Sequence, residues 1–231
     1  MNNSVLIGIG VGPGDPELIT LKAYRAIEQA DVIMYLTNEQ GESQALNLVK
    51  PLFKSIEAVH HPIIMPMKID RALANKAYDD AVLAVKSYFA SAKRVVFLCE
   101  GDPLFFGSFN YLVERLQGHC QVIPGISATQ AAAAQLCIAI TQQEQTMTVL
   151  SGRNTDQVIV SALKTFDTVY ILKAGKQRVR LLNLIRTAGR ETDCHYLEKI
   201  GREDEYIERC FDAIPEVEGP YFSLFFITCN R

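Results

Sequence analysis

Short apolar runs alternate with helix-like stretches along the first half of the chain, and this alternation limits the fold more than any other feature. Runs with the length and residue types of buried strands lie at 5–10, 32–36, 94–98 and 120–123. Helical periodicity is expected at 21–29, 42–52, 71–92, 109–117 and 128–136. Because parallel strands need crossover connections, this order predicts a mostly parallel sheet.

The second half repeats the pattern with fewer helices. After a polar stretch at 141–145, strands are expected at 146–150, 168–172, 194–200, 206–211 and 222–228, with helices at 156–165 and 177–187. The last three strands have no helix between them, so this sheet should be mixed. The fold class is therefore α/β with two domains, 1–143 and 144–231. In the first domain, His60 to Met67 is expected to be a Pro-punctuated connection.

Composition excludes several function classes. The 231 residues are 48% apolar and can bury a sizeable core, and the net charge of −3 argues against nucleic-acid binding. The N-terminus lacks a signal-peptide pattern and no apolar run could span a bilayer, so we expect a cytoplasmic protein without a membrane partner.

The cysteines and histidines do not predict a metal site. The six cysteines are dispersed without a Cys-x-x-Cys pair, so we expect reduced, buried thiols. His60 and His61 are adjacent and should point in different directions, which disfavours a shared metal ion.

One segment is basic within this acidic chain. Residues 151–202 contain ten Lys or Arg against five Asp or Glu, which would suit an anionic ligand. For Arg178, Arg180, Arg186 and Arg190, a solvated helix face is the preferred interpretation.

The first glycine-rich turn follows the first strand. Gly8-x-Gly10-x-Gly12 is not a dinucleotide fingerprint, because that pattern needs a glycine at position 13, where this chain has Pro13. Pro13 also removes a backbone donor from the turn. The turn allows close backbone approach but makes a poor phosphate cradle. It suits a nucleoside ligand without phosphate, or simply tight packing of helix on strand.

Two further turns resemble the first. Asp102, between Gly101 and Pro103, could accept hydrogen bonds from a ribose or an amine, or could cap the next turn. Phe105 could line an adenine, although such residues are more often core. Pro124 to Ser127 opens the next helix. Because the carboxyl ends of parallel strands meet at one edge, all three turns should gather there.

In these three motifs the chain resembles the tetrapyrrole methylase family, and the match spans nearly the whole sequence. The resemblance implies two α/β domains with S-adenosylmethionine bound in the cleft between them, and a homodimer. It implies donor contacts at Pro13, Glu100, Gly101, Asp102, Phe105, Ser127, Ala128, Leu172, Gly201 and Arg202.

The closing Gly219-Pro-Tyr-Phe-Ser-Leu224 resembles members that methylate C20 of precorrin-2, a polycarboxylate that would suit the basic segment. Cobalt-factor II or another tetrapyrrole is the alternative acceptor, and a non-catalytic donor-binding regulatory module is the alternative of another class. No residue is assigned as a catalytic acid or base, because alignment of the methyl donor with the acceptor carbon can supply the rate enhancement.

Overall fold

The computed structural model describes residues 4–53, 57–66 and 71–229, which fold into two compact units, Met1–Ser127 and Ala128–Arg231. Each unit is described by itself. The division between these units falls between residues 127 and 128. The expected domain boundary between residues 143 and 144 stays a prediction.

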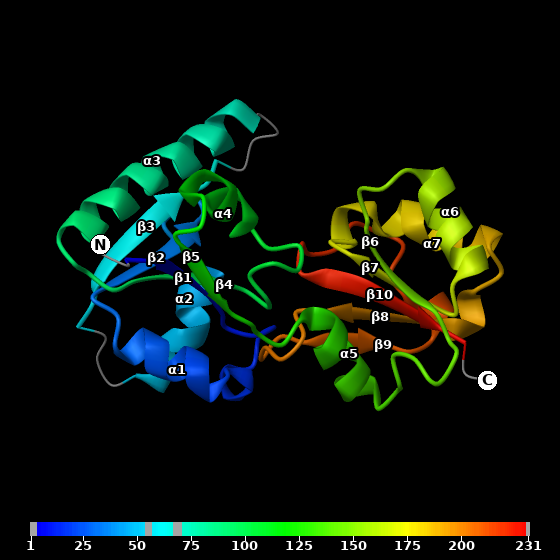
Figure 1. Cartoon of the computed structure of the whole chain (residues 1–231). Helices are drawn as coiled ribbons and strands as arrows, with labels where there is room; N and C mark the ends of the chain where they lie inside the picture. The colour runs from blue at the N-terminus through cyan, green and yellow to red at the C-terminus, as the bar shows by residue number, and fades with distance from the viewer. Residues whose placement is uncertain (1–3, 54–56, 67–70, 230–231) are drawn as a thin grey trace. The chain divides into compact units, whose positions relative to one another are not determined.

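The first unit is built on a five-stranded sheet in which every pairing is parallel, in the order β3-β2-β4-β1-β5 (Figure 1). Its strands are β1 (Leu6–Gly10), β2 (Val32–Thr37), β3 (Val59–Ile64), β4 (Val95–Cys99) and β5 (Cys120–Ile123). Its helices are α1 (Leu21–Glu28), α2 (Gln44–Val49), α3 (Arg71–Ala90) and α4 (Asn110–Leu116). The predicted parallel sheet is confirmed.

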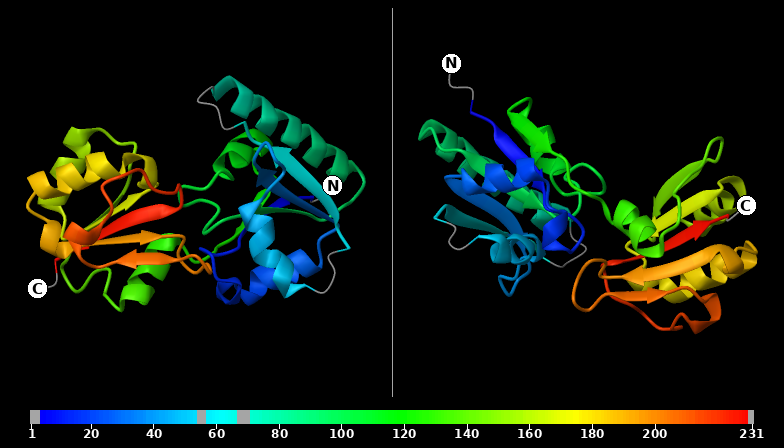
Figure 2. Two further views of the ribbon diagram at one scale, coloured as in Figure 1. Left: turned by 180° about the vertical axis from the view of Figure 1, so that it is seen from behind. Right: turned by 90° about the horizontal axis from the view of Figure 1, so that it is seen from below.

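Helices cover both faces of this sheet, as Figures 1 and 2 show. Apolar residues of α3 and α4 pack with Phe97 and its neighbours on one face, and those of α1 and α2 pack with Leu98 and its neighbours on the other. Since Phe97 and Leu98 are consecutive in β4, their side chains point to opposite faces. Thr20 begins α1 by accepting a hydrogen bond from the Ala23 N–H, which confirms the predicted cap.

The expectation that His60 to Met67 forms a connecting loop is wrong for most of this segment. Residues 59–64 form β3, which pairs with β2 at the edge of the sheet. An edge strand tolerates Pro62, because only one side of the strand needs donors. Met67 lies outside the described residues.

The second unit has a mixed sheet in the order β6-β7-β10-β8-β9. Its strands are β6 (Met147–Ser151), β7 (Thr168–Leu172), β8 (Cys194–Glu198), β9 (Tyr206–Glu208) and β10 (Ser223–Thr228). Its helices are α5 (Ala128–Leu136), α6 (Asp156–Thr165) and α7 (Arg178–Thr187). β10 runs antiparallel to both β7 and β8, while β6 and β7 are parallel, so the predicted mixed sheet is confirmed.

Hydrogen bonds tie α5 and the polar stretch after it to this second sheet. The Arg209 guanidinium donates to the carbonyls of Gln135 and Leu136, which are among the unpaired acceptors at the end of α5. The Thr168 hydroxyl donates to the Ile140 carbonyl at 2.7 Å. These bonds give a physical reason for the compact units to meet before α5.

The expectations for the cysteines and for a membrane span can be compared with this fold. All six cysteines are free thiols, but Cys137 and Cys210 are exposed, so the expectation of burial is wrong for these two. Across the part of the chain that the structure describes, no helix combines the length and apolar character that a membrane span requires.

Candidate functional site

The turns that follow β4, β1 and β5 meet at the carboxyl edge of the first sheet. These three strands are adjacent, and the backbones of Gly12 and Gly101 exchange hydrogen bonds across the edge, with Gly101 N to Gly12 O at 2.7 Å. The predicted gathering of the three turns is confirmed.

Direct backbone packing explains why glycine stands in these turns. A Cβ on Gly10 would lie 2.6 Å from the Gly101 carbonyl oxygen and 2.6 Å from the Gly125 Cα. A Cβ on Gly125 would overlap the same carbonyl. Gly12 and Gly101 also have φ of +89° and +63°, which side-chain-bearing residues rarely adopt. The glycines therefore allow the three turns to pack main chain against main chain, as one cluster, at the carboxyl edge of the sheet.

Asp102 joins the second turn to the third. Its Oδ1 accepts hydrogen bonds from the N–H groups of Leu104 and Phe105 at 2.9 and 3.1 Å, and its Oδ2 accepts one from Gly125 at 3.1 Å. Of the two roles the sequence left open, capping of the next turn is what the structure shows. The same carboxylate also holds the Gly125 turn beside Gly101.

The other candidate residues of the first unit surround this cluster. Pro13 and Glu100 are half-buried, and Glu100 follows Cys99, whose thiol pKa is raised well above its usual value by burial. Cys99 is thus a packing residue rather than a nucleophile. Phe105 is 38% exposed and its ring meets that of Phe106 edge-on at 5.3 Å.

The third turn passes directly from one unit into the next. Ser127 is buried and ends the first unit, and Ala128 is the first residue of α5. Adjacent in the chain, these two residues complete the set at the β1, β4 and β5 exits.

Leu172, Gly201 and Arg202 lie together at one edge of the second sheet. β7 ends at Leu172, and Gly201 and Arg202 follow β8, whose direction in the sheet is the same because both strands run antiparallel to β10. Gly201 has φ of +77°, and its N–H donates to the Glu205 carboxylate at 2.6 Å. The Arg202 guanidinium lies 4.4 Å from the Phe222 ring centroid.

The interpretation of the arginines on α7 as a solvated face is wrong for Arg178, which is 4% exposed. Its guanidinium donates to Glu198 at 2.7 Å and to the Val217 carbonyl at 2.7 Å. Burial raises the pKa of Tyr196 to about 12, so its phenol stays protonated and donates to Glu198 at 2.8 Å.

The interpretation is also wrong for Arg190, which is 9% exposed and donates to the carbonyls of Leu163, Phe166 and Asp167. Arg180 is half-buried and bonds Asp156 and the Gly152 carbonyl, and the partly exposed Arg186 pairs with Glu216. Much of the basic segment is therefore occupied with internal partners. An anionic ligand would have to bind to other cations of this segment.

Sequence reasoning missed the aromatic residues that stand beside Leu172 and Arg202. Tyr221 and Phe222 lead into β10, and the Lys173 ammonium lies 5.8 Å from the Tyr221 ring centroid. The signal was present in the Gly219 to Leu224 motif, which carries part of the family resemblance.

No metal-binding cluster of three or more His, Cys, Asp or Glu side chains is found among the described residues. His61 contacts the Tyr88 hydroxyl at 2.9 Å through Nδ1, and His60 meets Tyr35 edge-on. Both histidines thus have packing partners within the first unit.

Comparison with known proteins adds a family match. A family model described as tetrapyrrole (corrin/porphyrin) methylases matches residues 5–211. A precorrin-2 C(20)-methyltransferase of Sinorhizobium sp. is 31% identical, with 95% of this chain and 93% of the relative covered. A cobalt-precorrin-2 C(20)-methyltransferase of Salmonella typhimurium is 25% identical, covering 96% of this chain and 94% of the relative.

Solved structures share the fold. A uroporphyrin-III C-methyl transferase from Thermus thermophilus, complexed with S-adenyl homocysteine, superposes with a TM-score of 0.67 at 22% identity, covering 97% of both chains. At this identity the likeness concerns the fold alone.

Proposed function

The chain belongs to the tetrapyrrole (corrin/porphyrin) methylase family, and on that premise we propose that it transfers the methyl group of S-adenosylmethionine to C20 of precorrin-2, giving precorrin-3A in cobalamin biosynthesis. The observation that carries the proposal is the main-chain cluster formed by the Gly10, Gly101 and Gly125 turns. The 31% identical relative supports the choice of acceptor.

The cluster fits a donor of this kind. S-adenosylmethionine has a nucleoside and an amino-acid part but no phosphate, and main-chain groups at the carboxyl edge of a parallel sheet can bind both parts. In this proposal Pro13, Gly101, Ser127 and Ala128 contribute close main-chain approach. The partly exposed Phe105 ring offers a face to the adenine.

Polar and second-unit residues complete the proposed donor set. Glu100 would accept hydrogen bonds from the ribose or the amine, and Asp102 would act mainly by holding the Gly125 turn in place. Leu172, Gly201 and Arg202 would contribute from the edge of the second sheet.

The role of the protein in the reaction would be alignment. The methyl-bearing sulfonium is itself a reactive electrophile, so orientation of the accepting carbon in line with it can lower the barrier by several kcal/mol, of the roughly 7–11 kcal/mol that proximity can supply. We accordingly assign no catalytic acid or base, and no protein-bound metal.

A cobalt-containing acceptor is the second candidate, favoured by the Salmonella relative named for cobalt-precorrin-2. Purified protein incubated with labelled S-adenosylmethionine and either metal-free or cobalt-loaded precorrin-2 separates the two. Mass spectrometry and NMR of the product should show one added methyl at C20. Donor binding without transfer to either acceptor would favour a regulatory module instead.

The donor site has its own test. Asp102→Ala should weaken S-adenosylhomocysteine binding at least tenfold by calorimetry, because three N–H groups of two turns lose their acceptor. Asp79→Ala is the matched control, since the exposed Asp79 pairs only with Arg115 among its described ion-pair partners. Equal affinity in both variants would remove the Asp102 turn from the donor site.

We also propose that the protein is a homodimer in the cytoplasm, which the family resemblance supports. Light scattering of the purified protein should give twice the chain mass of 25.7 kDa. Cell fractionation should place it with the soluble enzymes.

A further inference from the structure

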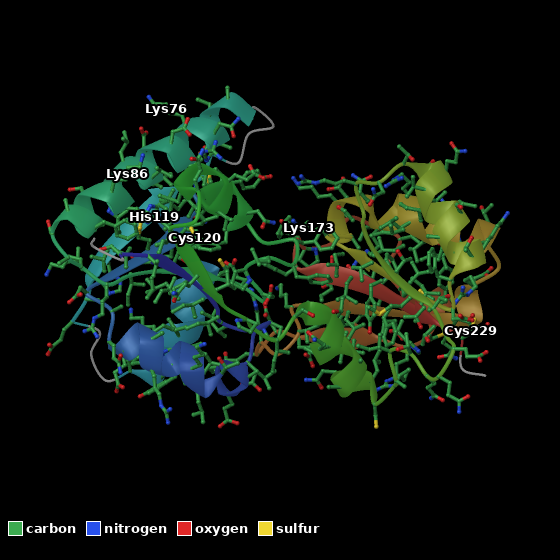
Figure 3. The ribbon with its side chains drawn as sticks, in the orientation of Figure 1. Lys76, Lys86, His119, Cys120, Lys173 and Cys229 are labelled. Carbon is green, nitrogen blue, oxygen red and sulfur yellow. The ribbon has the colours of Figure 1, made fainter. Side chains whose placement is uncertain are left out.

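Two cations and two aromatic rings form a continuous array at the carboxyl edge of the second sheet. The Lys173 ammonium lies 5.8 Å from the Tyr221 ring centroid, the rings of Tyr221 and Phe222 meet edge-on at 5.2 Å, and the Arg202 guanidinium lies 4.4 Å from the Phe222 centroid. We call these four residues the cation-aromatic array. Figure 3 labels Lys173 at the end of the sheet where β10 begins.

The sheet topology brings the array together from three strands. Lys173 directly follows β7, Tyr221 and Phe222 directly precede β10, and Arg202 lies in the turn after β8. Main-chain hydrogen bonds join these segments, from Ala174 N to Ser223 O at 3.2 Å and from Lys199 N to Phe222 O at 2.8 Å. The rings therefore lie just before the central strand, β10, near the ends of its two neighbours.

Buried charges hold the segment that carries the rings. Arg178 donates to the carbonyls of Val217 and Glu218, and its charge is balanced by Glu198 at 2.7 Å. Gly219 N–H donates to the Gly175 carbonyl at 2.9 Å, which ties the segment to the turn after Lys173. These bonds fix the main chain just before the two rings, which reduces the ordering that ligand binding would require.

The array combines cations with aromatic rings within the basic segment. Five of the ten cations between residues 151 and 202 form ion pairs with carboxylates of the second unit: Arg178, Arg180, Arg186, Arg190 and Lys199. The cationic groups of Lys173 and Arg202 lie over the rings of Tyr221 and Phe222. A cation over a ring can still bind an anion on its outer side, since the ring supplies only a partial negative charge.

A ligand that matches this surface is large, planar and anionic at its rim. We propose that the Lys173 end of the array recognises the acceptor, with the Lys173 ammonium pairing with a peripheral carboxylate of the tetrapyrrole and the Tyr221 ring packing against the macrocycle. This inference rests on the proposed function. Arg202, at the other end, belongs to the proposed donor set, so the array would carry the two substrates at its two ends.

The affinity of the full-length protein for a stable probe tests this assignment. Uroporphyrin III, a polycarboxylate tetrapyrrole, is titrated by absorbance in the presence of S-adenosylhomocysteine, and donor affinity is measured by calorimetry. Lys173→Gln should weaken uroporphyrin binding at least tenfold and flatten its salt dependence, while donor affinity changes less than twofold. Lys173→Arg should restore most of the binding.

Two controls separate charge from packing. Lys176→Gln removes an exposed cation three residues away and should leave uroporphyrin binding unchanged. Tyr221→Leu should weaken binding about fivefold to tenfold while Tyr221→Phe does not, because the ring and not the hydroxyl is used. Thermal unfolding of each variant checks that it is folded.

The outcomes divide clearly. Unchanged uroporphyrin binding in both Lys173→Gln and Tyr221→Leu overturns the proposal, as does a loss of donor affinity in Lys173→Gln with probe binding intact. If wild-type protein binds the probe through Lys173 but does not methylate precorrin-2, the array stands and the proposed function fails. If the Lys173→Gln variant methylates precorrin-2 at the full rate, the assignment of the array fails and the proposed function stands.

Discussion

The carboxyl edges of the two sheets are stabilised by different interactions. In the first unit, Gly10, Gly101 and Gly125 bring main chains into contact, and a single carboxylate, Asp102, joins two of the turns. In the second unit, the edge is held by long charged side chains, chiefly Arg178 with Glu198. The first edge therefore has no room for a Cβ at Gly10 or Gly125, whereas the second depends on the charge balance between Arg178 and Glu198.

The largest effect is expected from an added methyl group in the first edge. Gly125→Ala places a Cβ against the Gly101 carbonyl and 2.8 Å from the Gly10 Cα, and main-chain neighbours cannot move aside cheaply. Unfolding free energy should fall by about 3 kcal/mol, the upper part of the usual range for overpacking. Urea denaturation measures the loss, and calorimetry should show that donor affinity is lost as well.

Gly118→Ala is the control for that substitution. Gly118 has φ of +91° but nothing within 4 Å of the added Cβ, so only backbone strain of about 1–2 kcal/mol is expected. Donor affinity should be retained. Equal losses in the two variants would show that packing of the three main chains is not what the first edge depends on.

A comparable loss in the second edge should come from removal of one charge. Arg178→Met leaves the Glu198 carboxylate without its cation, and the two side chains are only 5% and 15% exposed. We expect a loss of about 3 kcal/mol in urea denaturation, the lower end of the range for breaking a buried ion pair, because both side chains keep some exposure. The double variant Arg178→Met, Glu198→Met should recover much of it. Additive losses in the double variant would contradict the ion-pair explanation.

A smaller effect is expected where a neutral side chain supports the second unit. The Thr168 hydroxyl lies 2.7 Å from the Ile140 carbonyl and 2.8 Å from the Thr228 hydroxyl, and all of Thr168 is buried. Thr168→Val keeps the shape and removes the donor, so unfolding free energy should fall by about 1–2 kcal/mol. Thr187→Val, at an exposed site on α7, should cost less and serves as the comparison.

Thiol labelling should distinguish the units without altering either. In native protein at pH 8, Cys137 and Cys210 of the second unit should react within minutes, because both are exposed. Burial raises the pKa of Cys120 to about 11, and Cys99 is buried, so the thiols of the first unit should react slowly. Mass spectrometry of digested samples gives the rates, and fast labelling of Cys99 would contradict this packing.

The sequence predicted the elements well where local pattern and packing agree. Four elements have the bounds that the structure shows: the strands at 120–123 and 168–172 and the helices at 128–136 and 156–165. The gathering of three turns followed from parallel strand order alone.

What the sequence could not provide depends on distant partners. Arg178 looks like a surface residue until Glu198, Tyr196 and the carbonyl of Val217 surround it, and no local pattern announces that pairing. Asp102 caps the next turn, which was one of its two local interpretations, but its hydrogen bond with the distant Gly125 N–H has no local signal. The roles proposed for the ten donor residues remain predictions.

Pro62 has a consequence for how the protein behaves at high concentration. It lies in β3, the outermost strand of the first sheet, where its missing N–H interrupts the ladder that another chain would need for pairing. Pro62 made this strand resemble a loop in the sequence, and it also disfavours aggregation by addition of a further strand at this edge.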